Sequence, residues 1–480
     1  MGKQFRNCDL NQAYLLPPSL QDWLPEGHLA RFVAEVVETL DLSEIYAKYE
    51  ERDGRGLAAY DPRMMVRLLI YGYCRGVAGS RRIERATYED VAFRYLAADQ
   101  HPDHTTIADF RQEHLASLSQ LFVQVLRLCQ RAGLVKLGHV ALDGTKVKAN
   151  ASKHKAMSYE RMGEAEKKLE EEVKALLAEA ARVDAEEDGK YGKGKRGDEL
   201  PEELARRERR LAKIGEAKAA LEEEAREAAK KKQAEVEAKL REREKQEEEG
   251  GRKLGGRPPQ ASDPEQAKPE PKAQRNFTDP DSRIMKDGAT KEFVQGYNAQ
   301  AAVDSQAQVI VAASVTQEAN DKKQLVPMLE QVEVMTGSKP EQATADAGYF
   351  SEQSVGDAKL EGIDLLVAPD RQKHGEEVPC ATGPSPPEGG VAERMRQKLR
   401  TVEGRAVYKM RKAVVEPVFG QIKEARGFRR FLLRGLGKVQ AEWQMICAPH
   451  NRRKLFRLGW NPQRTTRVLR EVYPERREWA

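Results

Sequence analysis

The spacing of apolar residues along the first quarter of the chain predicts several short amphipathic helices. Over residues 28–42, apolar side chains recur three and four positions apart, which is the spacing of one helical face. A second helix is expected to begin at Pro62, with Asp61 as its N-terminal cap. A third is expected over residues 103–133, where it ends at a glycine. Short helices joined by tight turns predict an all-α domain over residues 1–135.

Strand-like patterns begin after this domain. Residues 139–144 form a short apolar run, and residues 293–316 contain two apolar runs broken by a polar turn, which predicts a β-hairpin. An amphipathic helix over residues 322–337 follows, then a short strand before Asp346 and a buried strand over residues 363–369. This alternation predicts an α/β fold with a mixed sheet core.

Two segments interrupt the core and make it discontinuous in sequence. Residues 157–249 are rich in Glu, Lys, Arg and Ala with imperfect apolar seams, which predicts an inserted helical hairpin, with an antiparallel coiled coil as one form of it. Residues 250–275 have the composition of a flexible linker. The catalytic core is therefore expected over residues 136–156 and 276–460, followed by a C-terminal tail at 461–480.

Charge and cysteine content narrow the class of protein. The 480 residues carry a net charge of +5, with 33% charged and 39% hydrophobic residues. This mild basicity permits nucleic-acid binding without requiring it, because local clustering matters more than the total. The five cysteines are scattered and never form a C-x-x-C pair, which fits a reducing compartment. No apolar run has the length and continuity of a membrane span, so a cytoplasmic protein is expected.

Three carboxylates stand out against this background. Asp143 follows the first apolar run, Asp346 follows a short strand, and Glu416 neighbours an apolar helical face. Each also has a simpler interpretation: both Asp residues could be turn residues, and Glu416 precedes Pro417, where Glu is common for reasons of helix dipole. Their common setting, in apolar segments of the same core, favours one shared site.

Two-metal phosphoryl transfer is the chemistry that needs such a triad. Two Mg²⁺ ions activate an attacking oxygen and stabilise the leaving one, and three acidic side chains hold both ions if one of them bridges. Lys146 and Lys148 follow Asp143 closely and would face the phosphates of a DNA backbone. The acidic residue is thus predicted to bind metal, and the basic residues to bind polyanion.

Two further segments are candidates for DNA contact. The stretch "GFRRFLLRG" and the arginine before it interleave basic and aromatic side chains that could grip a DNA backbone, against the alternative of a solvated amphipathic face: Arg426, Phe428, Arg429, Arg430, Phe431 and Arg434. The segment "DHTTIADFRQEH" could be a recognition helix with Thr105, Thr106, Arg111 and Gln112 toward DNA, or a packing helix.

The chain resembles the DDE transposases of bacterial insertion sequences over most of its length. The segment from "QAYLLPPSLQDWLPEGHLARFV" through "DHTTIADFRQEHL" is similar to the N-terminal domain of these enzymes. The motif "DGTKVKANASKHKAMSY" resembles the region of their first catalytic Asp, and "ADAGYFSEQ" that of the second. The segment "RKAVVEPVFGQIKEARGFRRFLLRGLGKVQAEWQMICAPHN" resembles their Glu region. Three motifs in order, behind that N-terminal domain, predict the same activity here. The resemblance also implies that the mixed sheet is a ribonuclease-H-like catalytic core.

The resemblance implies roles for individual residues. Asp143, Asp346 and Glu416 would form the metal-binding catalytic triad with two Mg²⁺ ions, for which Mn²⁺ substitutes. The Glu region also resembles a Tyr–Arg–Glu–Lys signature whose basic residues contact transposon-end DNA. Tyr408, Arg411, Glu416 and Lys423 fill this signature, but Arg411 lies one residue further from the Glu than the signature specifies, and Lys412 occupies the nominal place.

The expected protein is therefore a cut-and-paste transposase. It would bind the terminal inverted repeats of its element, cleave with water as nucleophile and join a 3′-hydroxyl to target DNA. Its partners would be double-stranded DNA and at least one further copy of the chain, in a bacterial cytoplasm and on the nucleoid when bound, with no membrane. Two alternatives stay open at this point: a catalytically inactive protein that only binds the ends, and a plain Mg²⁺-dependent nuclease.

Overall fold

A computed structural model describes residues 19–51, 58–191, 202–250, 260, 263–288, 290–370 and 390–459, without the side chains of 179–191, 202–205, 249–250 and 458–459. The predicted tail at 461–480 lies outside this range, as does much of the predicted linker. The chain divides into two compact units. Unit 1 comprises residues 1–147 and 297–480, and unit 2 comprises residues 148–296.

Short helices form the first part of unit 1, as their apolar spacing predicts. Asp61 accepts hydrogen bonds from the backbone N–H groups of Arg63 and Met64, so the predicted cap of the helix that begins at Pro62 is confirmed. The predicted helix over 103–133 is instead two helices that meet at His114. The helices of this part are α1 (Leu29–Thr39), α2 (Ser43–Glu50), α3 (Pro62–Arg75), α4 (Ser80–Glu89), α5 (Val91–Leu96), α6 (His104–Glu113) and α7 (Leu115–Arg131).

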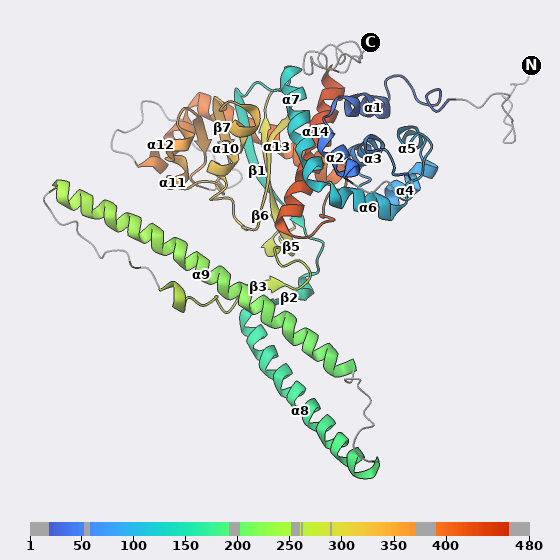
Figure 1. Cartoon of the computed structure of the whole chain (residues 1–480). Helices are drawn as coiled ribbons and strands as arrows, with labels where there is room; N and C mark the ends of the chain where they lie inside the picture. Colours follow the sequence, from blue (N-terminus) through green and yellow to red (C-terminus); the bar gives the residue numbers. More distant parts are fainter. Residues whose placement is uncertain are drawn as a thin grey trace, which may run out of the picture. The chain divides into compact units, whose positions relative to one another are not determined.

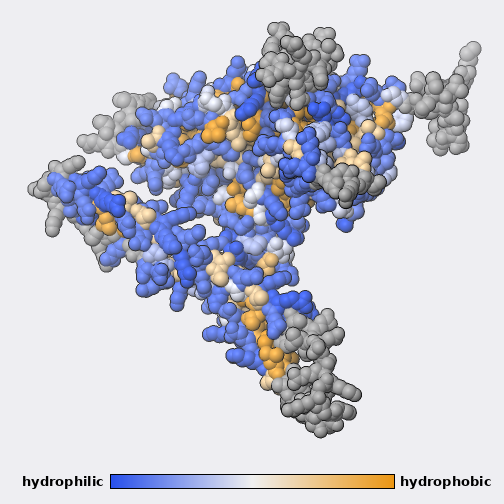
Figure 2. Space-filling model, viewed as in Figure 1, coloured by the Kyte–Doolittle hydropathy of each residue, from blue (hydrophilic) through white to orange (hydrophobic). Residues whose placement is uncertain are grey.

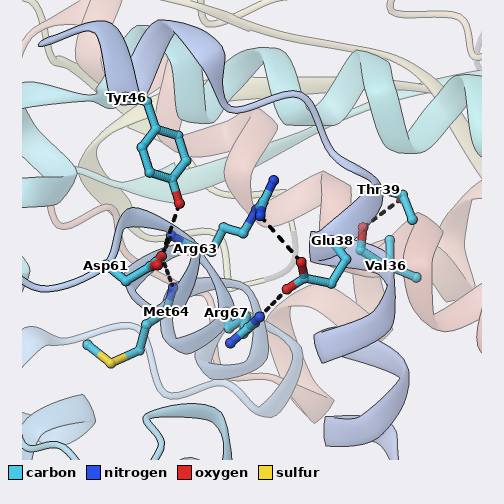
Figure 3. Close-up of polar contacts among 8 residues, drawn as sticks. All are labelled: Val36, Glu38, Thr39, Tyr46, Asp61, Arg63, Met64 and Arg67. Carbon is cyan, nitrogen blue, oxygen red and sulfur yellow. Dashed lines mark hydrogen bonds and ion pairs between the residues drawn. The ribbon is translucent and has the colours of Figure 1, made fainter. Parts of the chain in front are cut away.

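Polar contacts tie the first three helices together at their exposed side (Figure 3). Glu38 of α1 receives Arg63 and Arg67, which lie one turn apart on α3. The hydroxyl of Tyr46 on α2 donates to the capping carboxylate of Asp61 at 3.1 Å. Glu38 therefore links α1 to the first two turns of α3, and Asp61 links the start of α3 to α2. The apolar faces of these helices pack inward.

A mixed sheet lies at the centre of unit 1 (Figure 1). The predicted hairpin over 293–316 is confirmed as two antiparallel strands, β5 and β6. β4 also pairs antiparallel with β5, whereas β1 with β7 and β7 with β8 run parallel. The strand order is β4-β5-β1-β7-β8, with β6 also paired to β5. The strands are β1 (His139–Lys148), β4 (Arg283–Lys286), β5 (Phe293–Asp304), β6 (Val309–Thr316), β7 (Gln342–Ala345) and β8 (Asp364–Val367).

The helices after the hairpin pack against this sheet. The predicted end of α10 is confirmed, since Gly337 adopts the left-handed conformation that closes a helix. The last helix, α14, contacts α7, α3 and β6, and its fully buried Trp443 donates to the carbonyl of Gln300 at 2.9 Å. These helices are α10 (Leu325–Thr336), α11 (Glu352–Val355), α12 (Val391–Arg400), α13 (Val402–Gly420), a π-helical segment (Gln421–Ala425) and α14 (Leu436–Gly459).

Unit 2 contains the predicted helical hairpin. Helices α8 (Tyr159–Tyr191) and α9 (Glu202–Gly250) pair antiparallel, because Glu172 receives Arg207 while Glu166 receives Lys218. A small core of Met162, Leu169, Ile214, Ala217 and Leu221 joins them. Figure 2 shows an apolar strip along the α8 arm among hydrophilic surface. Strands β2 (Ala156–Ser158) and β3 (Gln274–Asn276) form a separate two-stranded sheet, and the 3₁₀ segments Lys153–Lys155 and Pro264–Gln266 flank it.

The first strand differs from its prediction in length. The sequence suggests that Asp143 closes the strand, but β1 continues to Lys148, so Asp143 lies inside it. The reason is that Val147 is buried and pairing in the sheet continues past the polar residues 143–146. Within the described residues, no helix combines the length and apolarity that a membrane crossing requires.

Candidate active site

The parallel pairing of β1 with β7 brings two of the predicted carboxylates together. Ala141 is opposite Thr344 in this register, so continuing it by two residues sets Asp143 beside Asp346. Asp346 follows the last residue of β7 directly, and its carboxylate accepts from the backbone N–H of Gly348 at 2.8 Å. This strand register supports the prediction that the two Asp residues share one site.

A third carboxylate, Asp321, lies in the same place. It belongs to the connection between β6 and α10 and accepts two side-chain amide hydrogen bonds. Asn298 Nδ2 donates to Asp321 Oδ1 at 2.6 Å, and Gln300 Nε2 donates to the same oxygen at 2.7 Å. Asn298 and Gln300 are two positions apart on β5, so they project from the same face of the strand. We refer to Asp143, Asp321 and Asp346 as the acidic site.

Two glycines let these groups approach the backbone. A methyl group in place of a hydrogen at Gly144 would lie 2.8 Å from Asp321 Oδ1 and 3.0 Å from Asn298 Oδ1, and closer still to Gln300. At Gly348 it would lie 2.9 Å from Asp346 Oδ1 and 3.4 Å from Asp321 Oδ2. Oxygen atoms of Asp321 therefore border the small spaces beside both glycines.

One cation compensates part of this negative charge. Arg411 of α13 is only 7% exposed, and its Nη1 lies 3.8 Å from Asp143 Oδ2. Its guanidinium also lies 5.8 Å from the centroid of the Tyr408 ring. Two members of the predicted DNA-contacting signature thus lie beside the acidic site, with Arg411 buried.

Burial and crowding of like charges change the protonation of Asp143. Burial is the largest cause, followed by the charge of Asp346, and together they raise the pKa of Asp143 to about 7. Arg411 and the Gly144 N–H act in the opposite direction, and Asp321 adds a smaller upward effect. The pKa of the buried Tyr349 hydroxyl, which hydrogen-bonds Gln300, is also raised well above its usual value by burial and the same three carboxylates. The acidic site is therefore a concentration of partly buried negative charge.

The third predicted triad member, Glu416, lies on the exposed side of α13, and no contact joins it to either Asp among the described residues. The helix that carries Glu416, α13, is nevertheless held against the turn between β5 and β6. Pro417 lacks the N–H that would bond to the Ala413 carbonyl, and that carbonyl instead accepts from Gln308 Nε2 at 2.9 Å. Further along, Lys423 Nζ donates to Thr145 Oγ1 at 3.0 Å.

The other predicted DNA-contacting residues lie at the surface to different degrees. Lys412, Lys148 and Arg430 are exposed, Lys146 is half-buried, and Arg429 is exposed and paired with Glu424.

Two arginines differ from what the sequence suggests. Arg426 is 4% exposed and donates to the Ile446 carbonyl, and Arg111 is 7% exposed and donates to the Ala78 carbonyl. Both support packing inside the protein, so they are removed from the set that could face DNA. Phe428 and Phe431 are also buried. For Arg426, Phe428 and Phe431, therefore, neither DNA contact nor a solvated face describes the structure, because all three pack inside the protein.

The donors of the acidic site fit a hard divalent cation. Carboxylate and amide oxygens are the ligands that Mg²⁺ uses, and Asn298 Oδ1 is buried without a hydrogen-bond partner in the described part of the chain. Within that part, no three side chains of His, Cys, Asp or Glu already converge closely enough to hold a metal ion. Metal binding would therefore have to draw the carboxylates inward.

Sequence reasoning missed Asp321, Asn298 and Gln300. Asp321 lies in a polar loop, "TQEANDKKQ", where an acidic residue is ordinary and does not indicate a site. The available signal was in β5: two amide residues at i and i+2 inside an otherwise apolar strand, which places both on one buried face. Buried amides need partners, so they point to a polar group nearby.

A mixed sheet with one partly buried carboxylate in β1 and another directly after the adjacent parallel strand β7 defines a class of α/β proteins with an acidic site at the sheet. Two family models narrow this class: a transposase domain (DUF772) matches residues 18–113, and a transposase DDE domain matches residues 385–456. These two matches support a DDE transposase of the insertion-sequence type. No curated protein and no solved structure matches the chain. Glu416 lies inside the second matched segment, whereas Asp143 and Asp346 lie outside both.

Proposed function

We propose that this chain binds the terminal inverted repeats of its insertion sequence, cleaves the DNA and joins the freed 3′-hydroxyl to target DNA. The observation that carries the proposal is the register of β1 and β7, which sets Asp143 beside Asp346 in a partly buried site. The mixed sheet around this pair supports the ribonuclease-H-like core that the sequence predicts. Asp321 contributes a further carboxylate to the same site.

Asp143, Asp346 and Glu416 are proposed to hold two divalent cations, with Mg²⁺ as the expected ion and Mn²⁺ as a substitute. When bound, such ions activate the attacking oxygen and stabilise the leaving oxygen of the phosphodiester. The protein's contribution is to hold the carboxylates in place: Asn298 and Gln300 fix Asp321. Arg411 balances the charge of Asp143.

Glu416 would reach the site from α13. Lys423 lies in the π-helical segment that continues α13, seven residues after Glu416. Lys423 contacts Thr145, which is two residues beyond Asp143 on β1. A modest adjustment of the exposed Glu416 side chain toward β1 is therefore proposed to complete the triad when metal and DNA bind.

DNA contact is proposed for the signature residues and for the basic residues at the surface of the core. Lys412, Lys148 and Arg430 are exposed and would bind backbone phosphates. Arg429 would exchange its partner Glu424 for a phosphate. Tyr408, Lys146 and Lys423 lie nearer the acidic site and would contact DNA close to the cleaved bond. The buried Arg411, the remaining signature residue, would act through Asp143 rather than by touching DNA in this arrangement.

The test uses the full chain, a labelled duplex carrying the inverted repeat, a target plasmid and Mg²⁺. Joined product supports the proposal, whereas cut ends alone indicate a nuclease and bound but uncut ends indicate an inactive end-binding protein. Asp143→Asn and Glu416→Gln should keep end binding and lose cleavage. Glu403→Gln, an exposed position in the first turn of the same helix α13, is the matched control and should cleave normally. Cleavage by either site variant would contradict the assignment of that residue.

A further inference from the structure

Unit 2 contains a large hollow whose ionisable lining, among the residues that the structure describes, is basic. The hollow measures about 1140 Å³ and opens between the start of α9, the segment before β2 and the residues after β3. Its floor is apolar and belongs to the small core of the helical hairpin, since Ile214 is buried there. The charged and titratable residues that line it are His154, Lys155, Arg206, Arg209, Arg210 and Lys213. We refer to it as the basic hollow.

The helix places four of these cations on one face. Arg206, Arg209, Arg210 and Lys213 follow the spacing i, i+3, i+4 and i+7, which is one stripe of an α-helix. Like charges at these spacings repel one another and disfavour the helix. An arrangement that keeps them together, with Lys155 added from a different segment, is suited to an anionic ligand that neutralises them.

The same helix pairs its other basic residues with carboxylates. Arg207, one position away from the stripe, contacts Glu172 of α8, and Lys218 contacts Glu166. Within the described chain, by contrast, no carboxylate pairs with Lys155, Arg206, Arg210 or Lys213. These side chains are also exposed. The hairpin therefore uses one side of α9 to hold α8 and presents the adjacent cations to solvent.

We propose that the basic hollow is a DNA-binding site that contacts the sugar-phosphate backbone without reading its sequence. Duplex DNA carries about one negative charge per 1.7 Å of its axis, which matches a closely spaced group of cations. Among the described residues of the lining, every charged group is a cation that can meet a phosphate, and none is an Asp or Glu that would repel one. The proposal rests on the proposed function for its choice of DNA as the polyanion.

The experiment compares two triple variants of the full chain with equal loss of charge. Arg206→Gln, Arg210→Gln and Lys213→Gln together remove three cations of the hollow. Lys230→Gln, Lys231→Gln and Lys232→Gln remove three exposed cations further along α9, outside the hollow, and serve as the control. Binding to the repeat duplex and to an unrelated duplex is measured by fluorescence anisotropy at several salt concentrations.

The hollow variant should bind both duplexes roughly ten-fold more weakly at ~0.1 M salt, and its salt slope should fall by about 3. The control should behave like the unaltered protein. Acetylation of lysines, read by mass spectrometry, should show that DNA protects Lys155 and Lys213 but not Lys230. Circular dichroism checks that the variants fold alike.

Equal DNA affinity and slope in the two triple variants would overturn the proposal. So would a hollow variant that keeps its DNA affinity but dissociates from a dimer to a monomer, because the hollow would then receive an acidic segment of a second copy. These results can be told apart from a failure of the proposed function. If the unaltered protein cleaves and joins DNA while the hollow variant binds DNA normally, only the proposal for the basic hollow is wrong. If the hollow variant loses DNA binding but Asp143→Asn still cleaves DNA, only the catalytic assignment of Asp143 is wrong.

Discussion

The acidic site and the basic hollow both concentrate charge of one sign, but they differ in burial and in how the charges are held. In the acidic site the carboxylates are partly buried and fixed by strand register and by the amides of Asn298 and Gln300. In the basic hollow the cations are exposed and share one helical stripe. Burial changes the protonation of a group, whereas exposed charges stay ionised and are screened by salt. The comparison therefore predicts pH-dependent chemistry in the first region and salt-dependent binding in the second.

The largest expected effect separates the two regions by function. At saturating repeat DNA, Asp346→Asn should lower the cleavage rate by about a thousand-fold or more, because it removes a proposed metal ligand. The triple hollow variant should recover nearly the full rate once DNA is saturating, because its defect is in binding. Single-turnover cleavage at increasing protein concentration measures both. If the hollow variant still cleaves slowly at saturating DNA, the basic hollow contributes to catalysis as well as to binding, and the assignment of separate roles to the two regions is wrong.

The second effect concerns stability and pH without metal. The pKa of Asp143 in the folded protein, about 7, lies above its ordinary value of 3.8, so the folded state binds this proton more tightly. The contribution of Asp143 to stability is therefore full below about pH 4 and lost as the pH rises through 7. Asp143→Asn should thus gain roughly 2–4 kcal/mol relative to the unaltered protein between pH 4 and pH 8.

Urea unfolding in EDTA at several pH values measures this difference. Adding Mg²⁺ should raise the melting temperature of the unaltered protein more at pH 8 than at pH 5, because protons compete with the ion for the carboxylates. A pH-independent difference between Asp143→Asn and the unaltered protein would show that Asp143 is not held in a charge-unfavourable setting.

The third effect tests the close approach at Gly144. In Gly144→Ala the new methyl group would meet Asp321 Oδ1 at 2.8 Å and Asn298 Oδ1 at 3.0 Å, so these groups must move. We expect a loss of about 1–3 kcal/mol of stability together with slower cleavage. Gly163→Ala is the matched control, because that glycine of α8 has open space around it. Equal melting temperatures for the two variants would contradict the packing described here.

The smallest effect ranks the two neighbours of Asp143. Both Asp346→Asn and Asp321→Asn should lower the pKa of Asp143, and Asp346→Asn should lower it more, because its charge is the larger of the two contributions. Carboxyl NMR titration of metal-free protein measures the order. The reverse order would place Asp321, rather than Asp346, as the nearer partner of Asp143.

Local periodicity predicted most of the elements, and the features it missed depend on information that periodicity does not contain. The β-hairpin over 293–316 and the end of α10 at Gly337 were predictable because alternation and a left-handed glycine act over a few residues. The break at His114 was not visible, since apolar spacing continues across it. The burial of Arg111 and Arg426 was equally hidden, because each depends on a carbonyl from a different element.

The sequence by itself predicted the helical hairpin, the β5–β6 hairpin and Asp143 and Asp346 as candidates, because these depend on short-range spacing and on motif chemistry. It did not predict the short strands β2, β3 and β4, and β3 begins inside the predicted linker. Only the tertiary structure decided that Asp321 joins them, since a loop residue reaches the site through the pairing of β5 with β1 and of β1 with β7. It also decided that Arg411 is buried beside Asp143. Contacts between distant segments depend on strand register and helix packing, which no local pattern encodes.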